Sequence, residues 1–108
     1  MTSSTENNTS VAMIIDQQMG GAMKDLLIGT YHKYAIKDGL QFKFRGSPVA
    51  NFVEIKLQEN DLYTMSFKKI RGFTALQGET FSDLYDENLV STFEETTKLF
   101  LSLHPSKQ

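Results

Sequence analysis

The sequence predicts an α+β fold: an antiparallel sheet of four to five strands, with an N-terminal short helix and a C-terminal amphipathic helix packed on one face. Three observations lead to this fold. Residues 51–72 have the pattern of a β-hairpin, Asp38-Gly39 marks a second hairpin, and apolar residues recur at helical spacing near both ends of the chain. A sheet with one apolar face needs a cover, and two amphipathic helices can supply it.

The N-terminal part of the chain predicts a leader and a short helix. Residues 1–9 are polar and rich in Ser, Thr and Asn, which is typical of a disordered leader before a single domain over 10–104. Thr9 or Ser10 can cap a helix of about ten residues that Gly20-Gly21 ends, because glycine adopts the left-handed conformation at low cost. Its apolar positions are Val11, Ile14, Ile15 and Met19. Residues 22–28 fit either a helical turn or the start of a strand.

The middle of the chain predicts the strands. Residues 29–36 are rich in β-forming residues and run into Asp38-Gly39, a strong hairpin signal. The next strand ends at Pro48, because proline cannot donate to a ladder. Residues 73–77 are expected to add a short edge strand. Side chains alternate between the faces of a strand, which predicts these inward positions: Leu40, Phe42, Phe44, Val53, Ile55, Leu57, Tyr63, Met65 and Phe67.

A closing helix is predicted from Ser82 or Asp83, its expected N-cap, to about Leu103. Acidic residues in its first two turns complement the helix dipole, and Pro105 ends it. Phe93 lies at the centre of its apolar stripe and is expected to pack on the inward row of the sheet. The stripe consists of Leu89, Phe93, Thr96 or Thr97, Phe100 and Leu103.

Composition excludes several classes of function. The 108-residue chain has no cysteine, which rules out disulfides, thiolate nucleophiles and cysteine-ligated metals. No signal peptide and no apolar run of about 18 residues is present, so we expect a cytoplasmic protein without membrane contact. The net charge of −2 conceals a division, because residues 24–72 carry nine basic and five acidic residues, whereas residues 73–108 carry six acidic and two basic ones.

The basic residues of the predicted strands form the candidate interaction face. Exposed basic and aromatic side chains on a sheet are one way of holding single-stranded nucleic acid. The ordinary interpretation is a solvated strand face whose lysines protect the sheet from aggregation, and the acidic pI of about 5.6 favours it. The candidate residues are Lys43, Arg45, Phe52, Lys56, Lys68, Lys69 and Arg71.

No residues point to catalysis, a cofactor or a metal. His32 and His104 are the only histidines, and neither has an obvious carboxylate partner nearby in the sequence. Asp83, Asp86 and Glu87 are explained by the helix dipole without a cation. Gly20-Gly21-Ala22 lacks the Lys-Ser/Thr of a phosphate loop. A small hydrolase that uses Glu59, Asp61 and His32 is a third and remoter alternative.

The chain resembles a group of small uncharacterised proteins encoded by bacteriophages, prophages and other mobile elements. The likeness covers about residues 15–103 and rests on Gly20-Gly21, Gly29, the segment Asp61-Leu62-Tyr63-Thr64-Met65-Ser66-Phe67-Lys68-Lys69-Ile70-Arg71-Gly72, and Tyr85, Leu89, Phe93 and Thr97. It departs at Lys98-Leu99-Phe100, where the group usually has Gly-Leu-Tyr. The resemblance implies a fold and a mobile-element origin, and implies no chemistry.

We therefore expect a non-enzymatic accessory or regulatory protein of a phage or mobile element that binds a host or phage protein. The alternative is a nucleic-acid-binding protein that uses the basic exposed face of the sheet. A homodimer is also expected, because an open sheet leaves two edges and Phe52 stands among charges on the wet face.

Overall fold

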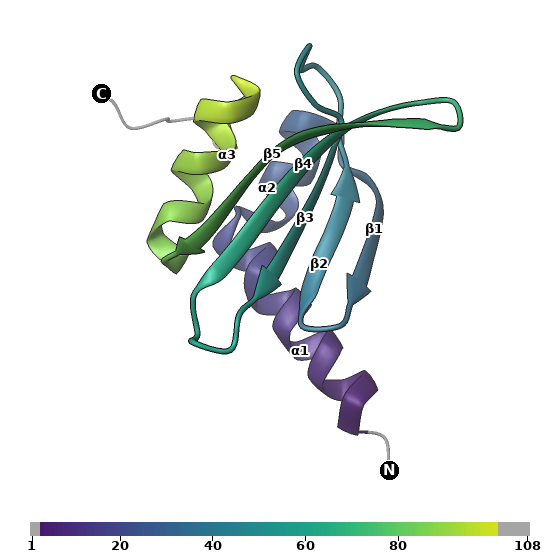
Figure 1. Ribbon diagram of the computed structural model, residues 1–108. Helices are drawn as coiled ribbons and strands as arrows, with labels where there is room; N and C mark the ends of the chain where they lie inside the picture. The colour runs from purple at the N-terminus through teal and green to yellow at the C-terminus, as the bar shows by residue number, and fades with distance from the viewer. Residues whose placement is uncertain (1–2, 102–108) are drawn as a thin grey trace.

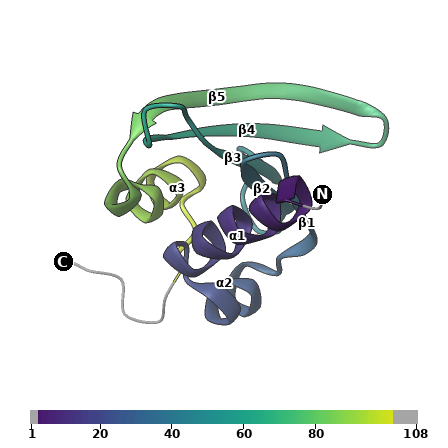
Figure 2. The same ribbon diagram turned by 90° about the horizontal axis from the view of Figure 1, so that it is seen from below.

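The computed structural model describes the backbone of residues 3–101 and the side chains of residues 10–101 (Figure 1). The five strands form one antiparallel sheet in chain order, and the helices cover one of its faces (Figure 2), which confirms the predicted α+β fold. The elements are α1 (Ser3–Gln18), α2 (Gly21–Ile28), β1 (Tyr31–Ile36), β2 (Gly39–Lys43), β3 (Phe52–Leu57), β4 (Tyr63–Arg71), β5 (Thr74–Leu84), the 3₁₀ turn η1 (Asp86–Asn88) and α3 (Leu89–Thr97).

The core lies between the sheet and the helices. The predicted inward positions of β2, β3 and β4 are all buried except Leu57, which is half-buried. Phe93 of α3 is fully buried, and its ring centroid lies 5.0 Å from that of Phe44, 5.9 Å from that of Phe67 and 6.3 Å from that of Phe42. The predicted contact between the closing helix and the inward face is therefore confirmed through these rings.

The N-terminal helix is longer than predicted. α1 begins at Ser3, so residues 3–9 are helical where the sequence predicts a disordered leader, and residues 1–2 lie outside the described residues. The physical reason is cooperativity: once residues 11–19 are packed on the sheet, each added residue gains a hydrogen bond without a new nucleation cost. α1 ends before Gly20, whose φ of 120° is a conformation that glycine adopts readily and other residues rarely do. Residues 22–28, which the sequence left as helix or strand, belong to helix α2.

The first hairpin has its loop one residue earlier than predicted. Ile36 pairs with Gly39, so the loop is Lys37-Asp38, and Asp38 adopts a φ of 59°. Asp tolerates this left-handed conformation better than most residues. Gly39 is instead required by a close approach, since a Cβ at this position would collide with the carbonyl group of Ile55.

The C-terminal elements differ most from the sequence prediction. β5 has 11 residues in place of a short edge strand, and it includes Ser82 and Asp83, which therefore do not cap a helix. α3 ends at Thr97, where Lys98 adopts a φ of 66° and its backbone N–H bonds to the carbonyl group of Glu94. Phe100 consequently leaves the stripe and is 57% exposed, and Leu101 is buried instead. Leu103 and Pro105 lie outside the described residues.

Candidate interaction surfaces

Helix α2 is oriented with its apolar stripe toward solvent. Met23, Leu26 and Leu27 have the i, i+3, i+4 spacing of one helix face, and all three are exposed, Leu26 at 80%. The opposite face buries Ile28 together with Lys24, whose exposure is 0%. An amphipathic helix in a soluble domain normally buries its apolar stripe. An apolar stripe left outside is the type of surface that marks an interaction site.

Lys24 is held inside by a network of four charged side chains. Its ammonium group lies 2.9 Å from the carboxylate of Asp16 in α1 and 2.5 Å from that of Asp25 in α2. Lys33 of β1 contacts the same two carboxylates, at 3.2 Å and 2.6 Å. The Lys24 ammonium also lies 4.5 Å from the centre of the Phe42 ring, within cation–π range. The network joins α1, α2 and β1 and fixes the rotation of α2.

The network shifts two pKa values. Burial alone would raise the pKa of Asp25, but hydrogen bonds from Lys24 and Lys33 outweigh burial, and the pKa lies below its ordinary value. Burial alone would lower the pKa of Lys33, but hydrogen bonds to Asp25 and Asp16 outweigh it and raise the pKa. Both groups are therefore held in their charged forms.

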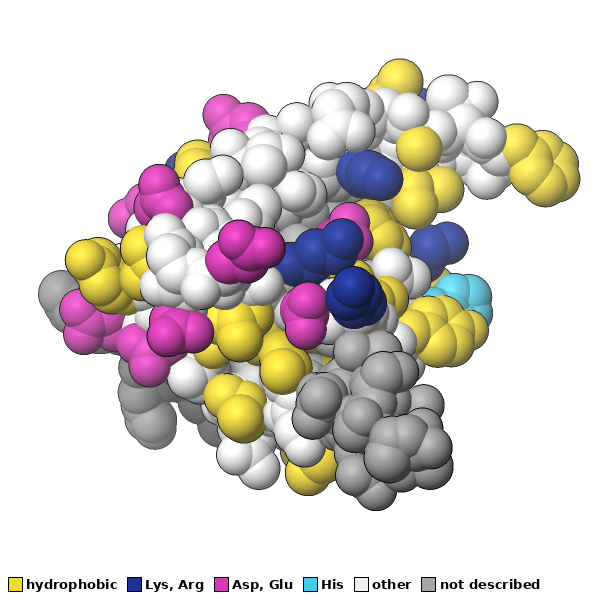
Figure 3. All heavy atoms as spheres, turned by 60° about the horizontal axis from the view of Figure 1, so that its bottom comes forward, with side chains coloured by type: hydrophobic (Ala, Val, Ile, Leu, Met, Phe, Trp, Pro, Cys, Tyr) yellow, Lys and Arg dark blue, Asp and Glu magenta, His cyan; other side chains and the backbone are white. Residues whose placement is uncertain are grey.

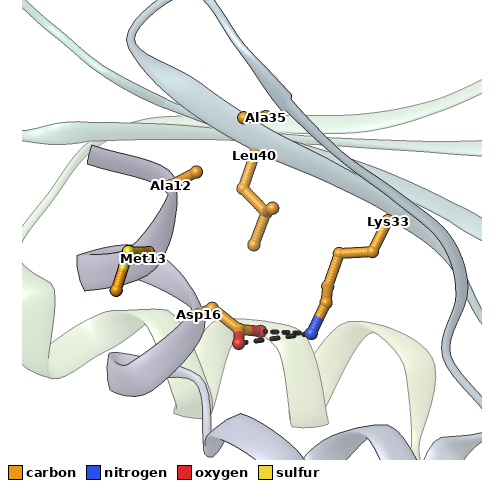
Figure 4. Close-up of a pocket in the computed structure, with 6 residues that line it drawn as sticks. All are labelled: Ala12, Met13, Asp16, Lys33, Ala35 and Leu40. Atoms are coloured by element: carbon orange, nitrogen blue, oxygen red, sulfur yellow. Dashed lines mark hydrogen bonds and ion pairs between the residues drawn. The ribbon is translucent and has the colours of Figure 1, made fainter. Parts of the chain in front are cut away.

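A shallow pocket adjoins the network between α1, β1 and β2 (Figure 4). Its volume is about 210 Å³, below the roughly 300–1,000 Å³ of ordinary ligand pockets. Asp16 and Lys33 pair with each other at its edge, at 3.2 Å and 3.3 Å, so neither is a free acid or base. The lining residues are Ala12, Met13, Asp16, Lys33, Ala35 and Leu40.

Four of the seven candidate residues of the sheet lie together on its open face. Cross-strand pairing places Lys43 opposite Phe52, and Phe52 opposite Lys68, in one row that Tyr31 of β1 extends. Arg45 joins this row, because its guanidinium lies 4.2 Å from the centre of the Tyr31 ring. The Lys68 ammonium is 5.7 Å from the Phe52 ring centre. We call Tyr31, Lys43, Arg45, Phe52 and Lys68 the open-face cluster.

The other three candidates lie outside the open-face cluster. Lys56 lies on the same open face as Phe52, but in a row nearer the β3–β4 turn, and it pairs with Glu54 at 3.5 Å. Lys69 follows Lys68 in β4, so its side chain leaves the opposite face of the strand, and it donates a hydrogen bond to the carbonyl group of Ser47. Arg71 is exposed at the end of β4. Five of the seven candidates therefore share the open face, whereas Lys69 and Arg71 leave the other face of β4, because side chains alternate through Lys68-Lys69-Ile70-Arg71.

The remaining candidates do not assemble into a site. Among the described residues, no group of three or more His, Asp or Glu side chains could hold a metal ion. His32 lies in β1 between the rings of Tyr31 and Tyr34, at 4.9 Å and 6.4 Å. His32 follows Tyr31, which pairs with Lys43 at the end of the sheet remote from the β3–β4 turn. Glu59 and Asp61 stand in that turn, so the three residues of the hydrolase alternative are separated. His104 lies outside the described residues.

The comparisons with known proteins add no assignment, since no family model, no curated protein and no solved structure matches the chain. Within residues 3–101, no helix is both long and apolar enough to cross a bilayer. Sequence reasoning missed the α2 stripe and the Lys24 network. The sequence did contain a signal in Met23-Lys24-Asp25-Leu26-Leu27. Lys24 lies four residues before Ile28, on the same helix face, where an apolar residue is expected.

Proposed function

We propose that this protein is a non-enzymatic binding module that docks another protein on the apolar stripe of α2. The observation that carries the proposal is the orientation of this helix, with Met23, Leu26 and Leu27 outside and Lys24 inside. Burying a lysine costs free energy unless it is paired. Here two carboxylates pair with Lys24, and a second lysine pairs with the same two carboxylates. Amphipathic helices bind partner proteins through stripes of this spacing.

The resemblance to small proteins of phages and mobile elements supports an accessory or regulatory role, with a host or phage protein as the partner. A non-enzymatic role is supported by the charged side chains that do meet, because Asp16 and Asp25 are already paired with Lys24 and Lys33. Partner binding by a small domain needs only a surface, and the exposed stripe supplies one.

The substitution Leu26→Glu should abolish partner binding without loss of stability. Leu26 is 80% exposed, so the change removes no core packing, and surface substitutions of this kind usually alter stability by less than about 0.5 kcal/mol. A carboxylate in the middle of the stripe opposes burial against an apolar partner surface. The measurement is affinity capture from nuclease-treated host lysate with the wild-type and variant proteins, together with their urea denaturation curves.

Val49→Glu is the matched control, because Val49 is a half-exposed apolar residue in the β2–β3 connection and not part of α2. Wild type and Val49→Glu should retain the same protein, and Leu26→Glu should lose it. Equal retention by all three would show that α2 is not the docking surface.

The open-face cluster favours a second candidate function, the binding of single-stranded nucleic acid. Lys43, Arg45 and Lys68 converge around two aromatic rings on one face that no helix covers. Because these cations lie over the rings, they form one continuous strip on the surface, along which a phosphate backbone can bind. The adjacent Glu54 and the acidic charge of the whole chain act against such binding, which places this function second.

A triple charge reversal of Lys43, Arg45 and Lys68 to Glu should abolish retention of a fluorescent single-stranded oligonucleotide. With three phosphates neutralised, log K of the wild type should fall with log salt at a slope of about −2. The matched control reverses Lys37, Lys56 and Lys98, which are exposed outside the cluster. Equal oligonucleotide binding by the cluster variant and the wild type, or binding that does not depend on salt concentration, would exclude this nucleic-acid-binding function.

A further inference from the structure

The end of the β4–β5 hairpin projects beyond the rest of the sheet as a two-stranded arm (Figures 1 and 2). Pairing between β3 and β4 ends at Phe52 and Lys68, and the side chain of Asn51 bonds to the backbone of Ile70 just beyond it. Beyond this point β4 pairs only with β5, as far as Arg71 and Thr74. We call residues 69–76 the arm. A two-stranded ribbon with no packing surface is only marginally stable in water.

The arm presents an aromatic side chain and a cation at its tip. Gly72 and Phe73 form the loop, where Gly72 has a φ of 58°. The Phe73 side chain is fully exposed, and that of Leu76 is more than half exposed. Figure 3 shows a hydrophobic group at the far end of the projection. Arg71 is exposed beside the loop, and residues 69–76 include no acidic side chain. Exposed apolar groups of this size mark a contact surface.

A hollow of complementary chemistry lies on α3. Its volume is about 400 Å³, and Glu94, Glu95 and Phe100 line it together with Ser91 and Lys98. Glu94 accepts a hydrogen bond from the backbone N–H of Leu101 at 2.9 Å, which fixes its carboxylate at the rim, and Glu95 is exposed. Acidic side chains gather on the α3 side of the molecule (Figure 3). The hollow therefore offers carboxylates and an exposed aromatic ring to a cation and an apolar side chain.

We propose that the arm of one copy docks into the α3 hollow of a second copy of this chain. The arm points away from α3 in both ribbon views, so the arm of one molecule does not lie near its own hollow (Figures 1 and 2). Arg71 then faces Glu95 of the other copy, and Phe73 packs against its Phe100. Two copies that exchange arms reciprocally form a closed dimer with both hollows filled. This contact uses neither the α2 stripe nor the open-face cluster, and so it stands apart from the proposed function.

Sedimentation velocity of the purified chain tests this contact. The wild type should pass from the 12.2 kDa chain toward twice that mass as its concentration rises. Arg71→Glu and Glu95→Lys should each raise the dissociation constant about tenfold at low salt, because each places like charges opposite each other. The double variant Arg71→Glu/Glu95→Lys restores opposite charges and should regain most of the wild-type affinity. Phe73→Ser should weaken association most, because it removes the buried anchor.

Lys37→Glu is the matched control, a charge reversal at an exposed lysine in the β1–β2 loop, and it should leave the mass distribution unchanged. Circular dichroism checks that each variant is folded, which the exposure of these side chains leads us to expect. A single-chain mass at every concentration would overturn the proposal. So would a double variant no better than the single variants, or association that nuclease treatment removes, which would assign the arm to nucleic acid.

Discussion

Phe93→Ala should destabilise the domain by about 3–5 kcal/mol, the largest effect expected of any single substitution in this chain. The ring is fully buried and stands among those of Phe42, Phe44 and Phe67. Truncation removes the transfer free energy of the ring and leaves a cavity that three other rings border. Because a domain of this size is stabilised by only about 5–15 kcal/mol, the variant should be close to unfolding at room temperature.

Phe52→Ala is the matched control, since Phe52 lies on the open face of β3 and is only half-buried. It should cost at most about 1 kcal/mol, mostly through the lost contact with the Lys68 ammonium. Urea denaturation of both variants gives the comparison. A larger loss for Phe52 than for Phe93 would show that the two faces of β3 are exchanged.

The sheet was predictable because its pattern is local. In Val53-Glu54-Ile55 and in Tyr63-Thr64-Met65, alternation with period two already separates the buried face from the open one. The length of β5 was not predictable in this way. Residues 74–84 carry few apolar side chains, and their strand is formed by pairing with β4 rather than by their own preference.

The site was less predictable than the fold, because its groups meet only in the folded chain. Lys24 and Asp25 are neighbours in sequence, but Asp16 and Lys33 reach them only when α1, α2 and β1 pack together. A pattern that places every lysine at the surface gives no sign that Lys24 faces inward, and residues 22–28 therefore stayed ambiguous. The open-face cluster was found in part, because Lys43, Phe52 and Lys68 obey the same alternation that identified the strands.

Lys24→Met should cost about 3 kcal/mol of stability, although it keeps the length and volume of the side chain. Removing one partner of a buried ion pair costs about 3–5 kcal/mol where the other charge is left buried and uncompensated. The lower end of the range applies, because Lys33 still contacts both Asp16 and Asp25. Thermal and urea denaturation at neutral pH measure the loss.

Lys56→Met is the control, since the same substitution there removes a pair with Glu54 at 3.5 Å from a side chain that is 53% exposed. Surface pairs of this kind contribute about 0–1 kcal/mol. An equal loss in the two variants would mean that the Lys24 network adds nothing beyond a surface pair. The comparison separates the buried charge from the methylene stem, because methionine replaces the stem at both positions.

Acidification supplies an independent test of the same network. The folded-state pKa of Asp25 lies below its ordinary value of 3.8, so its stabilising effect is complete above that pH and is lost as the pH falls through the folded-state pKa. Without Lys24 this depression shrinks, and the stability difference between wild type and Lys24→Met should narrow as the pH falls below 3.8. Lys33 makes the matching contribution at alkaline pH. Its folded-state pKa lies above the ordinary value of 10.5, so the stability that it contributes is complete below pH 10.5 and is lost as the pH rises through the folded-state pKa. A stability difference that stayed constant on acidification would show that Lys24 acts through packing and not through its charge.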